Sequence, residues 1–564
     1  MSGQYLVLFD ADRIRDYVFA TGRLKEIRGA SELVRQVTDE KKLLELKELA
    51  HFQLKKWQPD EQEGLIYAGG GAGALLFADE ERARSFCAEL ERLYRQRTGG
   101  ATLSAVWVEV QGSSVEAQQL AARSLAARKA SRPRSETIPG GAVLRFCASD
   151  RLYPASVRAP DPDNPAGLLV SEMTAIKRHG SHTYRQALEK SDFWQVFESL
   201  VSASARMAWR AAISDTNDLG HISEQARPQG YVALVYADGD GVGGSMRQVV
   251  AQLGFEGYQQ FSAALADAAI RATAEALAVA YRASPIEQPN PDRETRETRF
   301  LPFEVITIGG DDVILICTAE RGLAVACELS RRLGKLVNDW VDQYNNGQSN
   351  AQSQIVLDQP FSASVGVIIA HDSVPIVQLE RRGHDLLDSA KQAKQSGLGG
   401  IDFHVITTPG LDGINQTRSR DYSADNEKTC FTKRPYPLHR AELLLRYARH
   451  LRGLCDSNGI PVHLQSGTRD RQLTPEEIAE LPHLPDSKIA DLYTACRGSR
   501  IEATLDVLTV SMRLRERERK ALLQALHDLE SIKYYPFDAP DEEGVFRSAL
   551  PDLLEALSFV AEEG

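Results

Sequence analysis

The sequence predicts an α+β protein that contains two copies of one sheet-and-helix unit. Three observations support this. Segments 66–83 (IYAGGGAGALLFADEERA) and 306–323 (ITIGGDDVILICTAERGL) align without gaps. An apolar run that ends in paired aspartates precedes each segment. An alternating run, an alanine- and leucine-rich helical pattern and a short closing strand follow each one. This order is that of the split βαβ, ferredoxin-like arrangement, in which we expect helices on one face of an antiparallel sheet.

The individual elements follow in the same order in both copies. The first strands are expected within 5–14 and 232–243, and the glycine-rich segments 66–83 and 306–323 are expected to be hairpins. The later strands are expected at 102–110 and 361–369, with closing strands near 143–148 and 401–406. The first strand and the hairpin of each copy are expected to lie side by side at the centre of the sheet.

Bulk composition limits the class of protein. The chain has 564 residues, of which 43% are hydrophobic and 26% charged, as in soluble proteins of about two to four domains. No apolar stretch approaches the roughly 20 residues of a membrane helix, so no membrane partner is expected. Seven scattered cysteines without a CxxC pair, and a start that lacks a signal peptide, favour the cytoplasm. A net charge of −12 argues against a protein that coats nucleic acid, so any such contact should be local.

The two copies differ at the hairpin tip. Gly69 and Gly70 correspond to Gly309 and Gly310, but the next two residues are Gly-Ala in the first copy and Asp-Asp in the second. The aspartates that end the first strands correspond as pairs, Asp10 and Asp12 with Asp238 and Asp240. The acids should therefore converge fully only in the second copy. In the first copy, Asp10 and Asp12 could hold a noncatalytic metal or nucleotide, although two surface acids are the more ordinary reading.

Converging carboxylates repel one another unless cations neutralise them, and hard oxygen ligands favour Mg²⁺ or Mn²⁺. Such a site, with room for phosphate oxygens, predicts two-metal nucleotidyl transfer, in which a sugar hydroxyl attacks an α-phosphate and expels pyrophosphate. The expected metal ligands are Asp238, Asp240 and Asp311, and the expected catalytic residues are Asp238, Asp311 and Asp312. Strand alternation makes Asp311 the more certain ligand of the hairpin pair. The backbone of Gly239, Gly241, Gly243 and Ser245 is expected to cradle a triphosphate, and Gly309 and Gly310 to allow close approach.

These motifs resemble the Cas10 family, the large polymerase/cyclase subunit of type III CRISPR effector complexes. The resemblance rests on GGDD at 309–312, YADGDGVGGSM at 236–246 and DADRIRDYVFATGRLKEIRGASELV at 10–34, and it spans roughly residues 1–410. It implies two palm domains similar to GGDEF cyclases, with ATP as the substrate and cyclic oligoadenylate as the product. The run HDLLDSAKQAK at 384–394 is similar to a cyclase helix and implies that Lys391 reaches the triphosphate.

The resemblance also implies a domain order. We expect a first palm domain over 1–150, a mostly helical bridge over 151–229, a second palm domain over 230–410 and an α-helical domain over 411–564. Exposed loops at 153–167 and 407–428 should separate them. The HD nuclease domain and the zinc ribbon of many relatives are not expected here.

The expected partners are ATP, other type III effector subunits with guide RNA and target RNA, and a small helical subunit at the C-terminal domain. Two alternatives remain open. The protein could be a stand-alone cyclic dinucleotide or oligonucleotide synthase, or it could be a nucleotide-binding scaffold with little catalysis.

Overall fold

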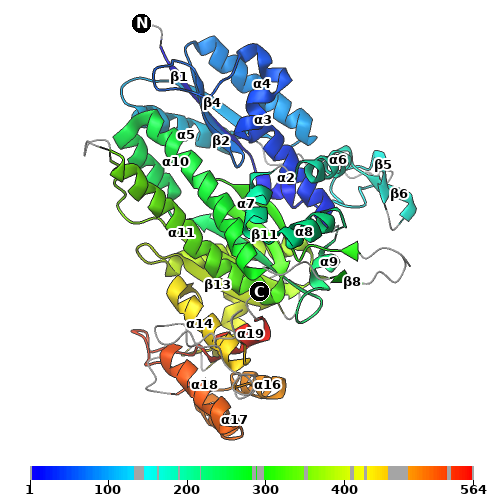
Figure 1. The fold of residues 1–564 in the computed structure, drawn as a ribbon, viewed down its shortest axis with the longest axis vertical. Coiled ribbons are helices and arrows are strands. Elements are labelled where there is room, and N and C mark those ends of the chain that lie inside the picture. The colour runs from blue at the N-terminus through cyan, green and yellow to red at the C-terminus, as the bar shows by residue number, and fades with distance from the viewer. Residues whose placement is uncertain are drawn as a thin grey trace.

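The structure is a computed structural model. It describes residues 3–132, 145–161, 164–188, 191–215, 218–281, 287–288, 298–348, 354–406, 412–424, 428–454, 481–529 and 535–561. The two copies seen in the sequence form two separate sheets, which we call the first repeat (residues 3–132) and the second repeat (residues 231–406). The first repeat lies at one end of the molecule, and three helices of the C-terminal region lie at the other, namely α16 (Asp486–Ala495), α17 (Arg500–Met512) and α18 (Glu516–Leu529) (Figure 1).

The first repeat has a four-stranded antiparallel sheet with the order β2-β3-β1-β4. Its strands are β1 (Tyr5–Ala11), β2 (Gly64–Gly69), β3 (Ala72–Phe77) and β4 (Leu103–Glu109). Its helical elements are α1 (Ile14–Val18), α2 (Leu24–Thr38), α3 (Glu40–Glu45), η1 (Lys47–Phe52), α4 (Glu80–Thr98) and α5 (Ser114–Ser131). Helix α5 begins with a capping box between Ser113 and Glu116. Helix α4 ends at Gly99, whose φ of 71° suits a glycine C-cap.

The second repeat has a six-stranded sheet with the order β10-β11-β7-β12-β13-β16. Its strands are β7 (Tyr231–Gly239), β10 (Phe303–Gly309), β11 (Asp312–Thr318), β12 (Ala363–His371) and β13 (Gly400–Ile406), with β16 (Tyr436–Pro437) at the edge. Its helical elements are α10 (Val242–Ala280), η2 (Ala319–Arg321), α11 (Gly322–Asn346), α12 (Ile376–Ala390) and η4 (Lys391–Ala393), and β8 (Glu287–Gln288) pairs with β9 (Thr298–Arg299). As predicted, the first strand β7 lies beside the hairpin strand β11 at the sheet centre.

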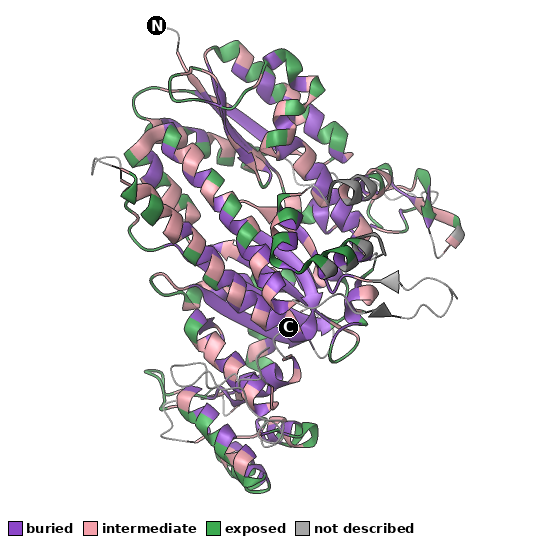
Figure 2. Cartoon of the chain, viewed as in Figure 1, coloured by how far each residue is buried: buried purple, intermediate pink, exposed green. Residues whose placement is uncertain are grey.

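Helices cover both faces of each sheet, so the expectation of helices on one face only is wrong. On β7, Ala233 and Val235 pack with α10 and α11, whereas Leu234 and Tyr236 on the opposite face pack with α12. The cause is visible in the sequence of β7, which is apolar at every position from 232 to 237 instead of alternating. Figure 2 shows the strands as buried ribbons between partly exposed helices.

Three further expectations need correction. Residues 145–148 add no strand to the first sheet, and Phe146 forms only an isolated bridge with Pro154. The predicted loop 153–167 contains most of a hairpin, β5 (Val157–Asp161) and β6 (Asn164–Val170). The predicted loop 407–428 contains α13 (Ile414–Asp421), while residues 407–411 and 425–427 lie outside the described residues. In the two predicted loops, the proline and glycine content indicates turns, but it does not indicate the short hairpin and helix that lie there.

The bridge contains α6 (Glu172–Leu188), α7 (Asp192–Leu200), α8 (Ala203–Asp215) and α9 (Leu219–Ser223). The C-terminal region contains α14 (Leu438–Leu451), α16 (Asp486–Ala495), α17 (Arg500–Met512), α18 (Glu516–Leu529) and α19 (Leu550–Ser558), and a small sheet of β14 (Ser423–Ala424), β15 (Thr429–Cys430) and β17 (Phe546–Arg547). Because β16 pairs with β13, this region completes the second sheet and is not purely helical. In the described parts of the chain, no helix combines the length and apolarity needed to cross a membrane.

The two repeats meet at their hairpin tips. A Cβ on Gly70 would lie 2.8 Å from the carbonyl carbon of Gly309, and a Cβ on Gly309 would lie 2.8 Å from the Cα of Gly70. A second contact is the ion pair of Arg28 on α2 with Glu304 on β10, both of which are buried. Arg28 Nε donates to Oε1 of Glu304 at 2.7 Å, and Nη2 donates to Oε2 at 2.5 Å. At the hairpin tips, Gly70 and Gly309 therefore let the two backbones come closer than a side chain would allow.

Candidate functional site

Three aspartates converge where β7 ends and β11 begins. Asp238 is the penultimate residue of β7, and Asp311 and Asp312 lie at the tip of the β10–β11 hairpin. The carboxyl groups of Asp311 and Asp312 both lie close enough to Asp238 to affect its pKa through hydrogen bonding. The sheet order produces this convergence because β7 and β11 are direct neighbours. Asp311 precedes the strand, so the turn brings it to Asp238 despite the alternation within β11.

The ammonium group of Lys391 pairs with the Asp238 carboxylate. Lys391 follows directly after α12, at the start of η4, so the helix end holds it over the strand end. Burial opposes ionisation of Asp238, but hydrogen bonds from Asp312 and Lys391 outweigh it and lower the pKa of Asp238. Asp238 is therefore the ionised member of the cluster.

The two hairpin acids behave in the opposite way. Burial, followed by the negative charge of Asp238, raises the pKa of Asp311 to about 7. Burial and Asp238 also raise the pKa of Asp312, although this residue is exposed to the adjoining cavity, where water moderates the effect. The hairpin acids therefore tend to hold protons near neutral pH, and a bound cation could take the place of those protons.

Asp240 is held differently from the other acids. Its carboxylate accepts hydrogen bonds from Ser362 Oγ at 2.7 Å and Ser364 Oγ at 2.8 Å, and its backbone N–H donates to the Ser362 carbonyl at 2.9 Å. These contacts tie the turn after β7 to the start of β12. Asp240 therefore has a visible structural role beside the role in metal binding predicted from the sequence.

The turn after β7 is open on its outer side. Gly241 has a φ of 72° and begins α10, and an added Cβ at Gly241, Gly243 or Gly244 would meet no atom within 4 Å. Ser245 lies in the first turn of the helix. By contrast, a Cβ on Gly239 would lie 3.0 Å from the Cβ of Asp311, so this glycine allows the strand end and the hairpin to meet. The helix start has the geometry of an anion-binding turn.

A cavity of about 740 Å³ lies between the two repeats and includes both hairpin tips. Asp312, Gly309 and Gly310 line it from the second repeat, and Asp10 and Lys129 line it from the first. Asp312 rather than Asp311 is the hairpin acid on its wall. A cavity of this size fits small-molecule ligands, which typically occupy sites of about 300–1,000 Å³.

The donor set of the cluster suits a divalent cation because every candidate ligand is a carboxylate oxygen. The raised pKa of Asp311 supports this fit, since a cation would offset the burial and the repulsion from Asp238 that raise it. Among the described residues, however, no three acidic, cysteine or histidine side chains already form a closed cation cage. Lys391 occupies Asp238 instead, so cation binding would require the lysine to yield part of that contact.

The first repeat contains an equivalent ion pair that the sequence interpretation missed. Lys129 near the end of α5 pairs with Asp10, as Lys391 pairs with Asp238. Ser104 Oγ donates to Asp12 at 2.9 Å, as Ser364 donates to Asp240. A sequence pattern common to both repeats could have identified Lys129: an alanine-rich helix with a lysine near its end, about 25 residues after the serine of the preceding strand. The similarity between the two repeats therefore extends beyond the hairpins to the lysine–aspartate pair and the serine–aspartate hydrogen bond.

Comparison with known proteins agrees with this geometry. Residues 231–397 match the family described as Cas10/Cmr2, second palm domain. No curated protein sequence matches the chain.

Among solved structures, the Csm1–Csm4 cassette in complex with pppApApA is 13% identical, with a TM-score of 0.51 and coverage of 99% of this chain and 70% of that chain. The same cassette in complex with cA4 is 14% identical, and Csm1 of T. onnurineus is 13% identical; both have a TM-score of 0.49 with the same coverage. At this identity the likeness concerns the fold. The chain therefore contains a second palm domain of the Cas10/Cmr2 family, which confirms the resemblance predicted from its sequence.

Proposed function

We propose that the protein is a nucleotidyltransferase that converts ATP to cyclic oligoadenylate in type III CRISPR defence, activated by target RNA. The observation that carries the proposal is the convergence of Asp238, Asp311 and Asp312 beside a cavity that both repeats enclose. A site that only binds a nucleotide has no need for carboxylates that repel one another, whereas nucleotidyl transfer uses them to hold cations.

In the proposed step, a 3′- or 2′-hydroxyl oxygen of one nucleotide attacks the α-phosphorus of another. The new O–P bond forms as the bond between the α-phosphorus and the bridging oxygen breaks, and pyrophosphate leaves with that electron pair. The hydroxyl proton passes to water or to a hairpin carboxylate. Repetition extends the chain, and attack by the terminal hydroxyl on the first α-phosphate closes the ring.

Asp238, Asp311 and Asp312 would hold Mg²⁺ or Mn²⁺, with Asp240 as a further candidate ligand. When bound, the cations would make the hydroxyl more acidic and stabilise charge on the phosphate. The open turn at Gly241 and Gly243 can receive phosphate oxygens on its backbone N–H groups. The ammonium group of Lys391, which pairs with Asp238 in the absence of ligand, would pair with a triphosphate oxygen instead.

The cavity gives a reason for two repeats. Nucleotidyl transfer requires two nucleotides side by side, and the cavity extends from Asp312 to Asp10 and Lys129 across the touching hairpins. We propose that the first repeat positions one nucleotide while the acids of the second repeat act on the other. The choice of adenine is supported by the solved complex of the Csm1–Csm4 cassette with pppApApA.

For partners, we propose a Csm4-type subunit, as in the solved cassettes, guide and target RNA, and a small helical subunit on the C-terminal region. The last proposal is supported by α17, on which four exposed apolar side chains follow a helical spacing. They are Ile501, Leu505, Leu508 and Met512. An unpartnered apolar stripe of this kind is typical of protein interfaces. We place the protein in the cytoplasm, where such partners would act.

The test is to incubate the purified full chain with Mg²⁺ or Mn²⁺ and each labelled nucleoside triphosphate, and to identify the products by mass spectrometry. The reaction is repeated with effector subunits, guide RNA and target RNA. Cyclic adenylates only in the complete mixture would support the proposal. Cyclic products from the chain alone would favour a stand-alone synthase. Nucleotide binding without product in either mixture would favour a scaffold.

A further inference from the structure

The turn after the first strand carries an arginine in the first repeat and a glycine in the second. Because Asp12 corresponds to Asp240, the next residue, Arg13, corresponds to Gly241. Their backbones agree, with φ 51° and ψ 46° at Arg13 and φ 72° and ψ 24° at Gly241. This left-handed conformation is strained for every residue with a Cβ, whereas glycine adopts it freely. An arginine at such a position suggests that its side chain has a function.

The turn that carries Arg13 is fixed on both sides. The Ala11 N–H donates to the Gly71 carbonyl at 2.9 Å, and the Asp12 N–H donates to the Thr102 carbonyl at 2.8 Å. The first contact ties the turn to the tip of the first hairpin, which touches the tip of the second. Arg13 is exposed and lines the cavity between the repeats. A rigid turn therefore presents a guanidinium group to the proposed nucleotide site.

The acids around this turn already have other cationic partners. Asp10 pairs with Lys129, and a carboxylate oxygen of Asp12 lies 3.1 Å from Nη1 of Arg132. Among the described residues, the guanidinium group of Arg13 forms no ion pair and no hydrogen bond. Its positive charge is therefore not offset by the acids of its own turn.

The other cations that line the cavity have acid partners. Arg35 pairs with Glu32, Lys41 with Asp192 and Lys129 with Asp10, and Arg15 lies 4.0 Å from Glu380. Within the described part of the chain, Arg13 is thus the lining cation that no acid offsets. An unpaired guanidinium group on a cavity wall is suited to bind an anionic ligand.

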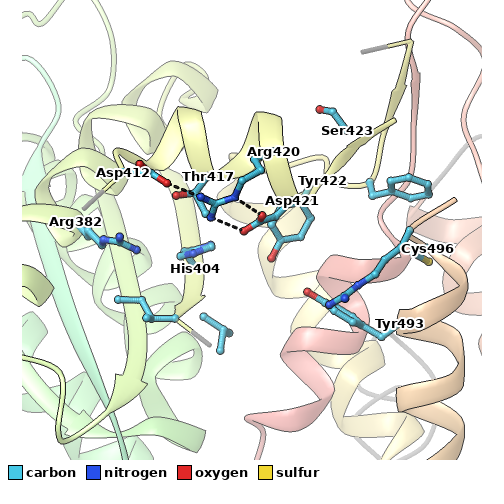
Figure 3. Close-up of a pocket in the computed structure, with 14 residues that line it drawn as sticks. Arg382, His404, Asp412, Thr417, Arg420, Asp421, Tyr422, Ser423, Tyr493 and Cys496 are labelled. Carbon is cyan, nitrogen blue, oxygen red and sulfur yellow. Dashed lines mark hydrogen bonds and ion pairs between the residues drawn. The ribbon is translucent and has the colours of Figure 1, made fainter. Parts of the chain in front are cut away.

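A second cavity, of about 570 Å³, shows the contrast. It lies between the second sheet and the C-terminal region. There Arg420 pairs with Asp412 and Asp421 (Figure 3), and Arg497 lies 5.6 Å from the centroid of the Tyr493 ring. These two guanidinium groups are engaged within the protein, unlike that of Arg13.

The proposed reaction requires positive charge in the first repeat. One nucleotide loses pyrophosphate at the acids of the second repeat, whereas the other supplies the hydroxyl and keeps its 5′-triphosphate. The first repeat has Gly71 and Ala72 where the second has its hairpin acids, so it lacks those metal ligands. A guanidinium group can neutralise phosphate oxygens and donate two parallel hydrogen bonds to them. Unlike a bound metal ion, it does not generate a nucleophile from a hydroxyl or water.

We propose that Arg13 binds the 5′-triphosphate of the nucleotide that supplies the hydroxyl, and that it does so without a metal ion. The identity of this ligand rests on the proposed function. No bond forms or breaks at this triphosphate while Arg13 holds it. Ring closure then requires the triphosphate to move from Arg13 to the acids of the second repeat.

The experiment measures binding of ATP and of adenosine to the purified full chain in EDTA by calorimetry. ATP should bind more tightly than adenosine although no metal is present. Arg13→Ala should weaken ATP binding about tenfold or more, as for loss of a charged hydrogen bond, and should leave adenosine binding unchanged. The matched control is Arg95→Ala, which removes an exposed arginine of α4 outside the cavity and should leave both affinities unchanged.

Arg13→Gly separates binding from a structural role. Glycine relieves the left-handed strain, so the Tm should rise while the affinity for ATP in EDTA falls. An ATP affinity in EDTA that Arg13→Gly leaves unchanged would overturn the proposal. Equal affinities of the unaltered chain for ATP and adenosine in EDTA would also overturn it.

The Asp311→Ala/Asp312→Ala variant separates this proposal from the proposed function. It should lose cyclic product but keep the binding of ATP in EDTA that depends on Arg13. If the unaltered chain makes no cyclic product in the complete mixture but still binds ATP through Arg13, the transferase proposal fails and the phosphate site stands. If it makes product but ATP binding in EDTA does not depend on Arg13, only the phosphate site fails.

Discussion

The two repeats share an ion-pair scaffold but differ at the hairpin. Both have an aspartate near the end of the first strand paired with a lysine at the end of a helix or just after it, and a second aspartate bonded to a serine. Only the second repeat has acids at the hairpin tip. In the first repeat the position of Asp311 is taken by Gly71, whose φ is 93° and whose added Cβ would lie 2.3 Å from Cδ1 of Ile14. Because the ion pairs occur in both repeats, we infer that they stabilise the fold. The hairpin acids occur only in the second repeat, and we infer that they serve the proposed chemistry.

The largest expected effect separates the two hairpins. Asp311→Ala/Asp312→Ala should reduce cyclic product at least about 10³-fold, because removal of preorganised charge at a transferred phosphate costs this order of rate. Asp10→Ala in the first repeat is the matched control and should cost far less. Product formation is measured by mass spectrometry in the complete mixture. An equal loss in both variants would mean that the first repeat is also catalytic.

The next effect concerns the contact that joins the repeats. Glu304→Ala leaves the buried Arg28 without its bidentate carboxylate and should lower the free energy of unfolding by about 3–5 kcal/mol. Lys41→Ala, which breaks an exposed pair with Asp192, is the control and should cost about 0–1 kcal/mol. Denaturant unfolding measures both. The Arg28→Met/Glu304→Leu pair should recover most of the loss, and failure to recover would show that packing rather than charge dominates there.

A smaller effect, on the KM for ATP, distinguishes Lys391 of the second repeat from Lys129 of the first. Lys391→Ala should raise the KM for ATP about tenfold, because the proposal places its ammonium on a triphosphate oxygen. Lys129→Ala should change the KM less, because its repeat lacks the hairpin acids. Steady-state kinetics over a range of ATP concentrations separates KM from kcat. Equal increases would show that both repeats bind a triphosphate in the same way.

The smallest effect is on the dependence of stability on pH. The pKa of Asp311 is raised from 3.8 to about 7 in the folded, cation-free protein. The folded state therefore binds more protons than the unfolded state between these values, and this contribution to stability is lost as the pH rises through 7. Because Mg²⁺ competes with those protons, the rise in Tm on adding Mg²⁺ should be larger at pH 8.5 than at pH 5.5. Asp311→Asn/Asp312→Asn should remove this difference, and a Mg²⁺ effect independent of pH would contradict the assignment.

Much of the site was predictable from the sequence because its signals are local. The gap-free repeat, the paired glycines and the position of aspartates at strand ends are short patterns, and they predicted the hairpins and the neighbouring strands β7 and β11. The role of Lys391 was predicted from a resemblance, and the structure places its ammonium on Asp238. Lys129 was missed because an alanine-rich helix with arginines and lysines on its surface has no local feature that singles out one of them.

The sequence by itself determined the repeat, the sheet order around the acids and the family of the second palm domain. Only the tertiary structure decided that the glycine tips of the two hairpins touch, that Asp312 rather than Asp311 lines the shared cavity, and that the C-terminal region adds β16 to the second sheet. The physical reason is distance along the chain. Strand patterns and turns depend on neighbouring residues, whereas a contact such as Gly70 with Gly309 depends on how two units that are far apart in the sequence pack against each other.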